Sequence, residues 1–218
     1  MIPYLLVVSR FNEKLEWLKQ EPFSKFPVLI YNKGDDQFYR PPNSWVVQLA
    51  NVGRESHSYL YHILFHYNHH AKVTIFLPGS MDKDYKMSRA LRMIEEIRRN
   101  HCAVFLGEKY ENNAFYSFQL EEWTSTSQEN HEKNPESTLA PARIRPFGKW
   151  YDSTFSTPLR YFSYYGIFSV DRSDILQRPR LFYKNLLKEL AFSSNPEVGH
   201  YIERSWASVL LLKETKVL

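Results

Sequence analysis

The chain has 218 residues, 43% hydrophobic and 24% charged, which is the composition of an ordinary folded domain. Cys102 is the only cysteine, so an intrachain disulfide is excluded, and no apolar run approaches the roughly 20 residues of a membrane span. We therefore expect one domain over residues 1–218, cytoplasmic and without a membrane span, which could belong to a longer chain. The net charge of +4 suits an anionic ligand and, equally well, a solvated surface.

Apolar runs alternate with helical spacing through the first half of the chain. This alternation predicts a Rossmann-like α/β fold, in which helices flank a central mixed, mainly parallel sheet and ligands bind at the carboxyl ends of the strands. We expect strands at residues 4–8, 27–31, 45–49 and 72–77, and helices at residues 13–19, 55–67 and 84–99.

The second half has a different pattern. Residues 124–148 are polar and proline-containing, which is typical of a long loop, and such a loop could fold over a ligand. Around this segment we expect strands at residues 102–106 and 161–170, the latter around Gly166, and helices at about 174–191 and 196–211.

Two carboxylates follow the strand predicted at residues 72–77. Asp82 and Asp84 flank Lys83 just before a predicted helix. A pair of aspartates on such a loop can hold Mg²⁺ or Mn²⁺ and leave positions open for phosphate oxygens. Aspartates at a helix start also cap amide groups and interact with the helix dipole, so the pattern alone leaves both roles open.

The loop after the strand at residues 45–49 contains Gly53 and Arg54 before a helix. Glycine allows close backbone approach, and an arginine at this place can bind phosphate through two parallel hydrogen bonds. The alternative is a plain loop with an Arg54–Glu55 surface pair. Neither the dinucleotide-binding nor the P-loop glycine pattern occurs.

The last predicted helix begins at Pro196 and has two faces. Val198, Ile202 and Trp206 mark an apolar stripe. A polar face carries an acid, an imidazole and a guanidinium, a set that can serve acid–base chemistry or simply meet solvent. These residues are Glu197, His200 and Arg204.

Histidines and arginines form two further patterns. His62 and His66 have a spacing that can chelate zinc, but the metalloprotease motif is absent, and polar contacts are the favoured interpretation. The basic run around Arg89 and Arg99 is interleaved with acids, which disfavours a nucleic-acid surface. The other histidines of the group are His57, His69 and His70.

Several segments together resemble a known family. Their order is VVSRFNE, YNKG, NVGRESHSYLYHI, TIFLPGS with DKD, YYGIFSV and NPEVGHYIERSW, and they extend from about residue 4 to residue 210. This order resembles GT-A-like nucleotide-sugar glycosyltransferases, a family that includes a domain encoded by chloroviruses. NVGRE and the segment from Glu197 to Trp206 are the most specific parts of the resemblance, and DKD is the least specific.

The resemblance implies a GT-A-like fold with a UDP-sugar at the carboxyl edge of the sheet. It implies Asp82 and Asp84 as ligands of Mn²⁺ or Mg²⁺, and Glu197, or second to it Glu203, as the catalytic carboxylate. Gly166 would belong to a loop on the acceptor side. The implied nucleotide-sugar contacts are Val8, Ser9, Arg10, Asn12, Arg54, Gly166, His200 and Arg204.

The function implied is transfer of a hexose or deoxyhexose from a UDP-sugar to a glycan or another hydroxyl acceptor. Inversion at the anomeric carbon is favoured, and retention stays open. No nucleic-acid partner is expected. The alternatives are a non-catalytic nucleic-acid-binding module, which would show a steep salt dependence, and a sugar-binding module without turnover.

Overall fold

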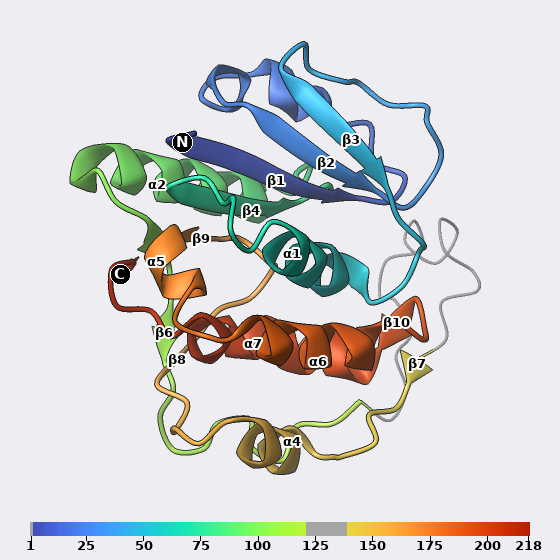
Figure 1. Cartoon of the computed structure of the whole chain (residues 1–218), viewed down its shortest axis with the longest axis vertical. Helices are drawn as coiled ribbons and strands as arrows, with labels where there is room; N and C mark the ends of the chain where they lie inside the picture. The colour runs from blue at the N-terminus through green and yellow to red at the C-terminus, as the bar shows by residue number, and fades with distance from the viewer. Residues whose placement is uncertain (1, 121–138) are drawn as a thin grey trace.

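The computed structural model describes residues 2–120 and 139–218, and a five-stranded sheet lies at its centre (Figure 1). The strand order is β3-β2-β1-β4-β9. The first four neighbours are parallel, and β9 (Phe168–Asp171) runs antiparallel to β4. The prediction of a mixed, mainly parallel α/β sheet is therefore confirmed. The parallel strands are β1 (Tyr4–Arg10), β2 (Val28–Asn32), β3 (Ser44–Gln48) and β4 (Val73–Pro78).

Helices connect these strands and flank the sheet. α1 (Arg54–Phe65) joins β3 to β4, and α2 (Asp84–Asn100) follows β4, both close to their predicted ranges. The helical spacing at residues 13–19 forms a short 3₁₀-helix, η1 (Glu16–Lys19), followed by η2 (Phe23–Lys25). The predicted helix is interrupted at Leu15, which adopts a left-handed conformation with φ 62° just before η1.

The rest of the chain builds a second layer of helices and three small strand pairs. α5 (Arg172–Ile175), α6 (Arg180–Leu190) and α7 (Glu197–Leu210) lie on the α1 side of the sheet, and α4 (Phe147–Thr154) lies beyond α7 (Figure 1). The paired short strands are β5 (Val104–Phe105) with β11 (Lys216–Val217), β6 (Glu108–Lys109) with β8 (Tyr161–Phe162), and β7 (Leu139–Ala140) with β10 (Asn195–Pro196).

The strands β1, β2 and β4 are buried on both faces, with alternate residues in two different cores, whereas the edge strand β3 is partly exposed. Leu5 and Val7 of β1 face the core shared with α1, α6 and α7, whereas Leu6 and Val8 face the core shared with α2. Successive strand residues point to opposite faces, which explains the continuous apolar run of this strand.

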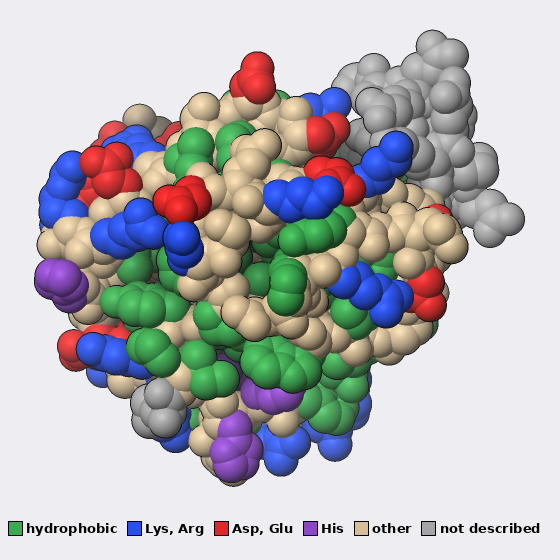
Figure 2. Space-filling view, turned by 90° about the horizontal axis from the view of Figure 1, so that it is seen from above, with side chains coloured by type: hydrophobic (Ala, Val, Ile, Leu, Met, Phe, Trp, Pro, Cys, Tyr) green, Lys and Arg blue, Asp and Glu red, His purple; other side chains and the backbone are tan. Residues whose placement is uncertain are grey.

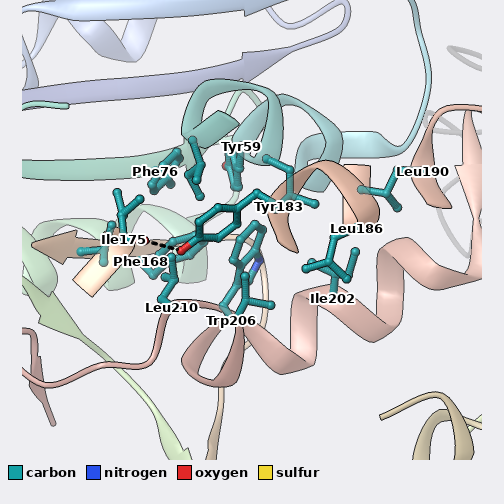
Figure 3. Close-up of a cluster of buried hydrophobic side chains, with 14 of the residues drawn as sticks. Tyr59, Phe76, Phe168, Ile175, Tyr183, Leu186, Leu190, Ile202, Trp206 and Leu210 are labelled. Carbon is teal, nitrogen blue, oxygen red and sulfur yellow. Dashed lines mark hydrogen bonds between the residues drawn. The ribbon is translucent and has the colours of Figure 1, made fainter. Parts of the chain in front are cut away.

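The larger core lies between the sheet and α7, where aromatic rings pack closely (Figure 3). Trp206 of α7 lies 4.7 Å from Phe168 of β9 between ring centroids, and Phe168 lies 4.9 Å from Phe76 of β4. The Tyr183 hydroxyl donates to the Ile175 carbonyl at 2.8 Å, so α6 is fixed to α5 by a buried hydrogen bond. These contacts fix the position of α7 against the sheet.

Two predicted elements are interrupted in the structure. The strand expected at residues 161–170 divides into β8 and β9, because Tyr165 and Gly166 adopt left-handed conformations with φ of 73° and 62°. The helix expected at 174–191 divides into α5 and α6 around Pro179, which lacks an amide hydrogen and constrains the residue before it.

The polar segment predicted as a loop at residues 124–148 is described only in its last part. Residues 121–138 lie outside the described residues. The described remainder contains β7 and the start of α4 at Phe147, so this part is not simply a loop. None of the helices described by the structure is both long and apolar enough to cross a bilayer.

Candidate functional site

The carboxyl edge of the sheet contains a topological switch point. From β1 the chain proceeds to β2 and then β3 on one side, and α1 then carries it back to β4 on the other side of β1 (Figure 1). In open α/β sheets ligands bind in the crevice where connections from neighbouring strands diverge in this way. The ends of β1 and β4 are therefore the first place to look for a site.

Arg10 ends β1 but is engaged within the protein. Its guanidinium donates to Asn32 Oδ1 at 2.6 Å and to Asp35 Oδ1 at 2.9 Å, and it lies 4.1 Å above the Phe38 ring. Its Nε donates to the Glu13 carbonyl at 2.6 Å. Arg10 is almost fully buried, so it braces the loops after β1 and β2.

The other residues predicted around the end of β1 have separate environments. Val8 points into the core on the α2 side. The Ser9 hydroxyl lies 2.8 Å from the Ser58 hydroxyl, which joins β1 to α1. Asn12 lies against Gly34, where a Cβ atom would come within 2.3 Å of Asn12 Oδ1. Close packing rather than an open pocket surrounds these side chains.

The loop before α1 has a backbone conformation that L-residues seldom adopt. Gly53 has φ 62°, and a Cβ there would come within 2.7 Å of both His57 Cβ and Leu190 Cβ. Arg54 is also left-handed, with φ 51°. The buried Lys33 amino group donates to the Val52 carbonyl at 2.5 Å and to the Arg54 carbonyl, so it holds this loop in place.

Arg54 reaches from this loop toward α7. Its Nη1 lies 3.4 Å from Asn195 Oδ1 and 3.3 Å from His200 Nε2, and its Nε lies 3.7 Å from Glu55 Oε2. Burial, then Arg54 and then Arg204, lower the pKa of His200 to about 3. His200 is therefore a neutral imidazole beside a cation, and the structure brings Arg54 and His200 together as expected for one site.

Glu203 lies six residues beyond Glu197 on α7, which is about 1.7 turns at 3.6 residues per turn, and faces the sheet edge. It accepts a hydrogen bond from the Tyr165 amide at 2.6 Å, and Arg204 Nη1 lies 3.9 Å away. Burial and the Glu55 carboxylate raise the pKa of Glu203 above its usual value, and Arg54 opposes that shift. A carboxyl group with a raised pKa in a partly buried site is suited to accept and release a proton.

Gly166 brings the β8–β9 turn against α1. A Cβ on Gly166 would come within 2.9 Å of Glu55 Cγ, and the Gly166 carbonyl accepts a hydrogen bond from the Tyr59 hydroxyl at 3.0 Å. The left-handed turn therefore places the backbone of Tyr165 beside Glu203 and that of Gly166 beside Glu55.

Lys86 completes a group of opposite charges at the edge. Its amino group donates to the Ser80 hydroxyl at 2.7 Å. Burial lowers the pKa of Lys86, and the charges of Glu55, Arg54, Glu13 and Glu203 also act on it. Side chains from the loops after β1, β3 and β4 and from α7 thus share one electrostatic environment.

Asp82 lies between β4 and α2, Asp84 is the first residue of α2, and both are exposed. Within residues 2–120 and 139–218 neither carboxylate makes a hydrogen bond or an ion pair, not even with Lys83. The same part of the chain contains no group of three or more His, Cys, Asp or Glu side chains that could hold a metal ion. Two unengaged carboxylates fit a hard cation that takes its remaining oxygen ligands from phosphate and water.

Glu197 lies on the opposite side of α7 and is completely buried. Its carboxylate accepts hydrogen bonds from the Leu120 amide, the Ala142 amide and the Tyr201 hydroxyl, each at 2.8 Å, and pairs with Arg145 Nε at 2.9 Å. Burial raises the pKa of Glu197, but these hydrogen bonds outweigh it and leave the pKa below its usual value.

The helix face predicted to be polar therefore does not meet solvent at Glu197. The segments at Leu120 and Ala142 cover the Glu197 carboxylate through their amides. α4 covers the same helix face further along, where the Tyr201 and Trp150 ring centroids are 5.5 Å apart. The apolar stripe through Val198, Ile202 and Trp206 is buried as predicted. Arg204 also lies under cover, 4.0 Å above the Phe118 ring.

The histidines near the end of α1 form a buried polar cluster. His62 Nδ1 lies 3.0 Å from the Tyr31 hydroxyl, and its ring lies 4.8 Å from His66 and 5.2 Å from His70. Burial lowers the pKa of His70 to about 4. It also lowers the pKa of His62 well below its usual range, so the His62 ring is neutral. These polar contacts agree with the interpretation favoured over zinc.

Several residues at the edge had not been singled out from the sequence. Lys33 and Lys86 are the two lysines of this group, and both amino groups donate hydrogen bonds within it. Their signal was their place in the chain, since Lys33 directly follows β2 in the segment YNKG and Lys86 lies in the first turn of α2 after the segment DKD. Others in this group are Glu13, Tyr85 and Tyr165.

The molecular surface shows mixed charge. On the face seen in Figure 2, basic and acidic side chains lie next to each other. Nucleic-acid binding commonly uses a continuous basic stripe. This face therefore gives no support to the nucleic-acid alternative.

Comparison with known proteins gives one family. No curated protein sequence matches the chain. A family model with the description "Protein of unknown function (DUF3431)" matches residues 5–217, almost the whole chain. The chain therefore belongs to the DUF3431 family.

Proposed function

We propose that this protein is a metal-dependent glycosyltransferase that moves a hexose or deoxyhexose from a UDP-sugar to a hydroxyl group of a glycan or other acceptor. The observation that carries the proposal is the position of Glu203. This partly buried carboxylate lies beside Glu55 and near Arg54 and Lys86, at the switch point of a mainly parallel sheet. A proton acceptor and cations are thus together where α/β folds bind ligands.

The GT-A-like part of the proposal has support from the topology. Strands β3, β2, β1 and β4 follow the order of a nucleotide-binding α/β half, and the antiparallel β9 extends that sheet beyond β4. The two segments most specific to the family resemblance, around Arg54 and around Glu203, meet at this edge although they are far apart in the sequence.

Glu203 is a better catalytic base than Glu197 on physical grounds. Both oxygens of Glu197 are occupied by donors, so a new proton there would displace a hydrogen bond or the Arg145 ion pair. Glu203 has a raised pKa, which brings it closer to the pH at which a base works best. We therefore assign the base to Glu203 and a structural role to Glu197.

The proposed reaction is a direct displacement. The acceptor hydroxyl oxygen forms a bond to the anomeric carbon of the donor, and the bond between that carbon and the diphosphate oxygen breaks. The hydroxyl proton passes to Glu203, and the electron pair of the broken bond leaves with UDP. One displacement at the anomeric carbon inverts its configuration.

The leaving group develops negative charge that the site must offset. Arg54 supplies positive charge from the start of α1 and Lys86 from the first turn of α2, and both side chains are partly exposed. Asp82 and Asp84 would hold Mn²⁺ or Mg²⁺. When bound, such a cation would neutralise diphosphate charge and orient its oxygens.

Calorimetry with UDP-glucose tests the proposal. We expect binding in the presence of Mn²⁺ and a loss of at least about tenfold in affinity when the metal is removed or when Asp82 and Asp84 are both changed to Asn. Glu95→Gln on the exposed face of α2 is the control, because its ion pair with Arg99 lies in solvent. Equal affinity with and without metal would refute the metal-bridged form of the proposal.

A second candidate is a sugar-binding module without turnover. It is favoured by an exposed pair of aromatic rings at the edge, Tyr85 and Tyr165, whose centroids are 4.9 Å apart. A product assay with UDP-glucose and simple sugar acceptors separates the two functions, because the module would bind the sugar and release no UDP.

A further inference from the structure

Tyr85 and Tyr165 form an exposed aromatic surface, which we call the tyrosine pair. Tyr85 lies in the first turn of α2 and is 52% exposed, and Tyr165 lies in the turn between β8 and β9 and is 41% exposed. Their centroids are 4.9 Å apart and their planes meet at 55°. Side by side at the sheet edge, the two exposed rings form an apolar surface that a ligand can cover.

The backbone holds Tyr165 in a costly conformation. Its φ of 73° is uncommon for a bulky side chain, and such conformations persist where surrounding contacts fix them, often at ligand sites. Here the Tyr165 amide donates to Glu203 Oε1 at 2.6 Å. This hydrogen bond fixes the backbone of Tyr165 and joins it directly to the proposed catalytic base.

The neighbouring side chains make the surroundings of the pair polar. Arg204 lies 5.2 Å from the Tyr164 ring, whose centroid is 6.0 Å from that of Tyr165. Asp84 precedes Tyr85 in the chain and is exposed. An apolar ring surface next to the carboxylates of Asp84 and Glu203 suits a pyranose, which has an apolar face of C–H groups and a rim of hydroxyls.

We propose that the tyrosine pair binds a pyranose ring of the acceptor and presents its hydroxyl to Glu203. The assignment to the acceptor rests on the proposed function. The acceptor hydroxyl must reach the base that takes its proton, whereas the nucleobase of a UDP-sugar is separated from the reacting carbon by the ribose and the diphosphate. A ring surface whose backbone contacts the base therefore belongs with the acceptor.

Saturation-transfer NMR with methyl glucopyranoside, galactopyranoside, mannopyranoside and fucopyranoside tests this proposal directly. We expect at least one of these probes to bind the wild-type protein, with affinity reduced about tenfold in Tyr85→Ala and Tyr165→Ala. Tyr85→Phe and Tyr165→Phe keep the rings and should retain most of the binding. Melting temperatures of all four variants establish that the fold is intact.

Phe65→Ala is the matched control. Phe65 is 55% exposed and stacks on Tyr61 at 4.1 Å between centroids, but it lies at the end of α1 opposite Arg54. Its removal should leave pyranoside binding unchanged. Equal loss in Phe65→Ala and in the tyrosine variants would overturn the proposal, because it would mean nonspecific stacking.

UDP calorimetry on the same variants separates the remaining outcomes. UDP affinity within about twofold of wild type, with weakened pyranoside binding, supports the acceptor assignment. Weakened UDP binding would overturn it, because the rings would then stack on the nucleobase. So would pyranoside binding that is absent from the wild type or unchanged in the alanine variants. Pyranoside binding without any UDP binding would retain the sugar surface and refute the glycosyltransferase.

Discussion

Two sides of one helix, α7, place a glutamate in opposite physical situations. On the side facing α4, Glu197 is 0% exposed and receives two backbone amides, a tyrosine hydroxyl and an arginine. On the side facing the sheet edge, the Glu203 side chain is 17% exposed, and an amide and a neighbouring arginine approach it near a second carboxylate.

The difference separates stability from chemistry. Donors lower the pKa of Glu197 and fix its charge, so this side chain holds segments together. Burial and Glu55 raise the pKa of Glu203, so this side chain is poised to exchange a proton. A carboxylate whose oxygens are all occupied by hydrogen-bond donors is a structural group. A carboxylate with few donors is the better candidate for a catalytic base.

Changing Glu203 to Gln should give the largest effect on activity. The amide cannot accept the acceptor proton, so turnover should fall by about 10²- to 10⁴-fold. The unfolding free energy should change little. The variant loses the repulsion between the Glu203 and Glu55 carboxylates, and this gain offsets the weaker hydrogen bond from the Tyr165 amide. UDP release from UDP-glucose and urea unfolding measure the two quantities.

Donor affinity in this variant supplies the control, and it should stay near the wild-type value. Turnover within about threefold of wild type would break the comparison, because Glu203 would then have no part in proton transfer.

Changing Glu197 to Gln should give the largest effect on stability. Its new NH₂ group would face either the Leu120 or the Ala142 amide, and Arg145 would lose its ion pair. We expect a loss of about 2–4 kcal/mol in unfolding free energy, measured by urea denaturation. At a temperature where the variant is folded, its turnover should stay within about tenfold of wild type.

The pH dependence of this loss has a definite sign. The pKa of Glu197 is lower in the folded protein than its usual value of 4.5, so the unfolded chain binds more protons in the interval between the two values. Its contribution is complete above about pH 4.5 and is lost as the pH falls through the folded value. The difference between Glu197→Gln and wild type should therefore shrink in acid, and a difference that grows there would contradict the assignment.

The sequence predicted the sheet and α1 and α2 well, because apolar periodicity follows burial directly. The run YLLVV at residues 4–8 needed two covered faces, and the structure has them. Periodicity does not record interruptions such as Pro179 or the left-handed turn at Tyr165, because these depend on a few backbone angles.

The candidate site was predictable only in part. Arg54, His200 and Glu203 belong to the segments on which the family resemblance depends, and the structure brings these three side chains close together. The choice between Glu197 and Glu203 depended on long-range contacts with Leu120, Ala142 and Tyr165, which no local pattern contains. Lys33 was missed for the same reason, since its carbonyl partners lie in another loop.

Lys33 extends the comparison to the sheet edge. Its pKa lies near neutral pH, whereas that of Glu197 lies in the acid range. Burial lowers the pKa of Lys33 from 10.5 to about 7. Between these values the unfolded chain holds a proton that the folded protein lacks, so the unfolding free energy rises with pH. This contribution is complete above about pH 10.5 and is lost as the pH falls toward 7.

Lys33→Met removes this titration and leaves the Val52 and Arg54 carbonyls without their donor. Relative to this variant, the wild type should gain stability from pH 7 to pH 10, by at most about 1.4 kcal/mol per pH unit. Urea midpoints across that range measure the gain. Lys72→Met, at an exposed lysine, is the control: it keeps Lys33, so its urea midpoints should rise with pH as those of the wild type do. Parallel stability curves for wild type and Lys33→Met would show that Lys33 keeps an ordinary pKa.

Tyr201→Phe should give the smallest change in unfolding free energy. It tests whether the donors to the Glu197 carboxylate contribute equally to stability. The variant removes one hydrogen bond of 2.8 Å and keeps the ring that packs on Trp150. Because Leu120, Ala142 and Arg145 still hold the carboxylate, the expected loss is about 0.5–1.5 kcal/mol, and turnover should not change. A loss as large as that of Glu197→Gln would mean that Tyr201 alone fixes the carboxylate. A fall in turnover without a fall in stability would instead place Glu197 in the chemistry, and the two sides of α7 would no longer differ in kind.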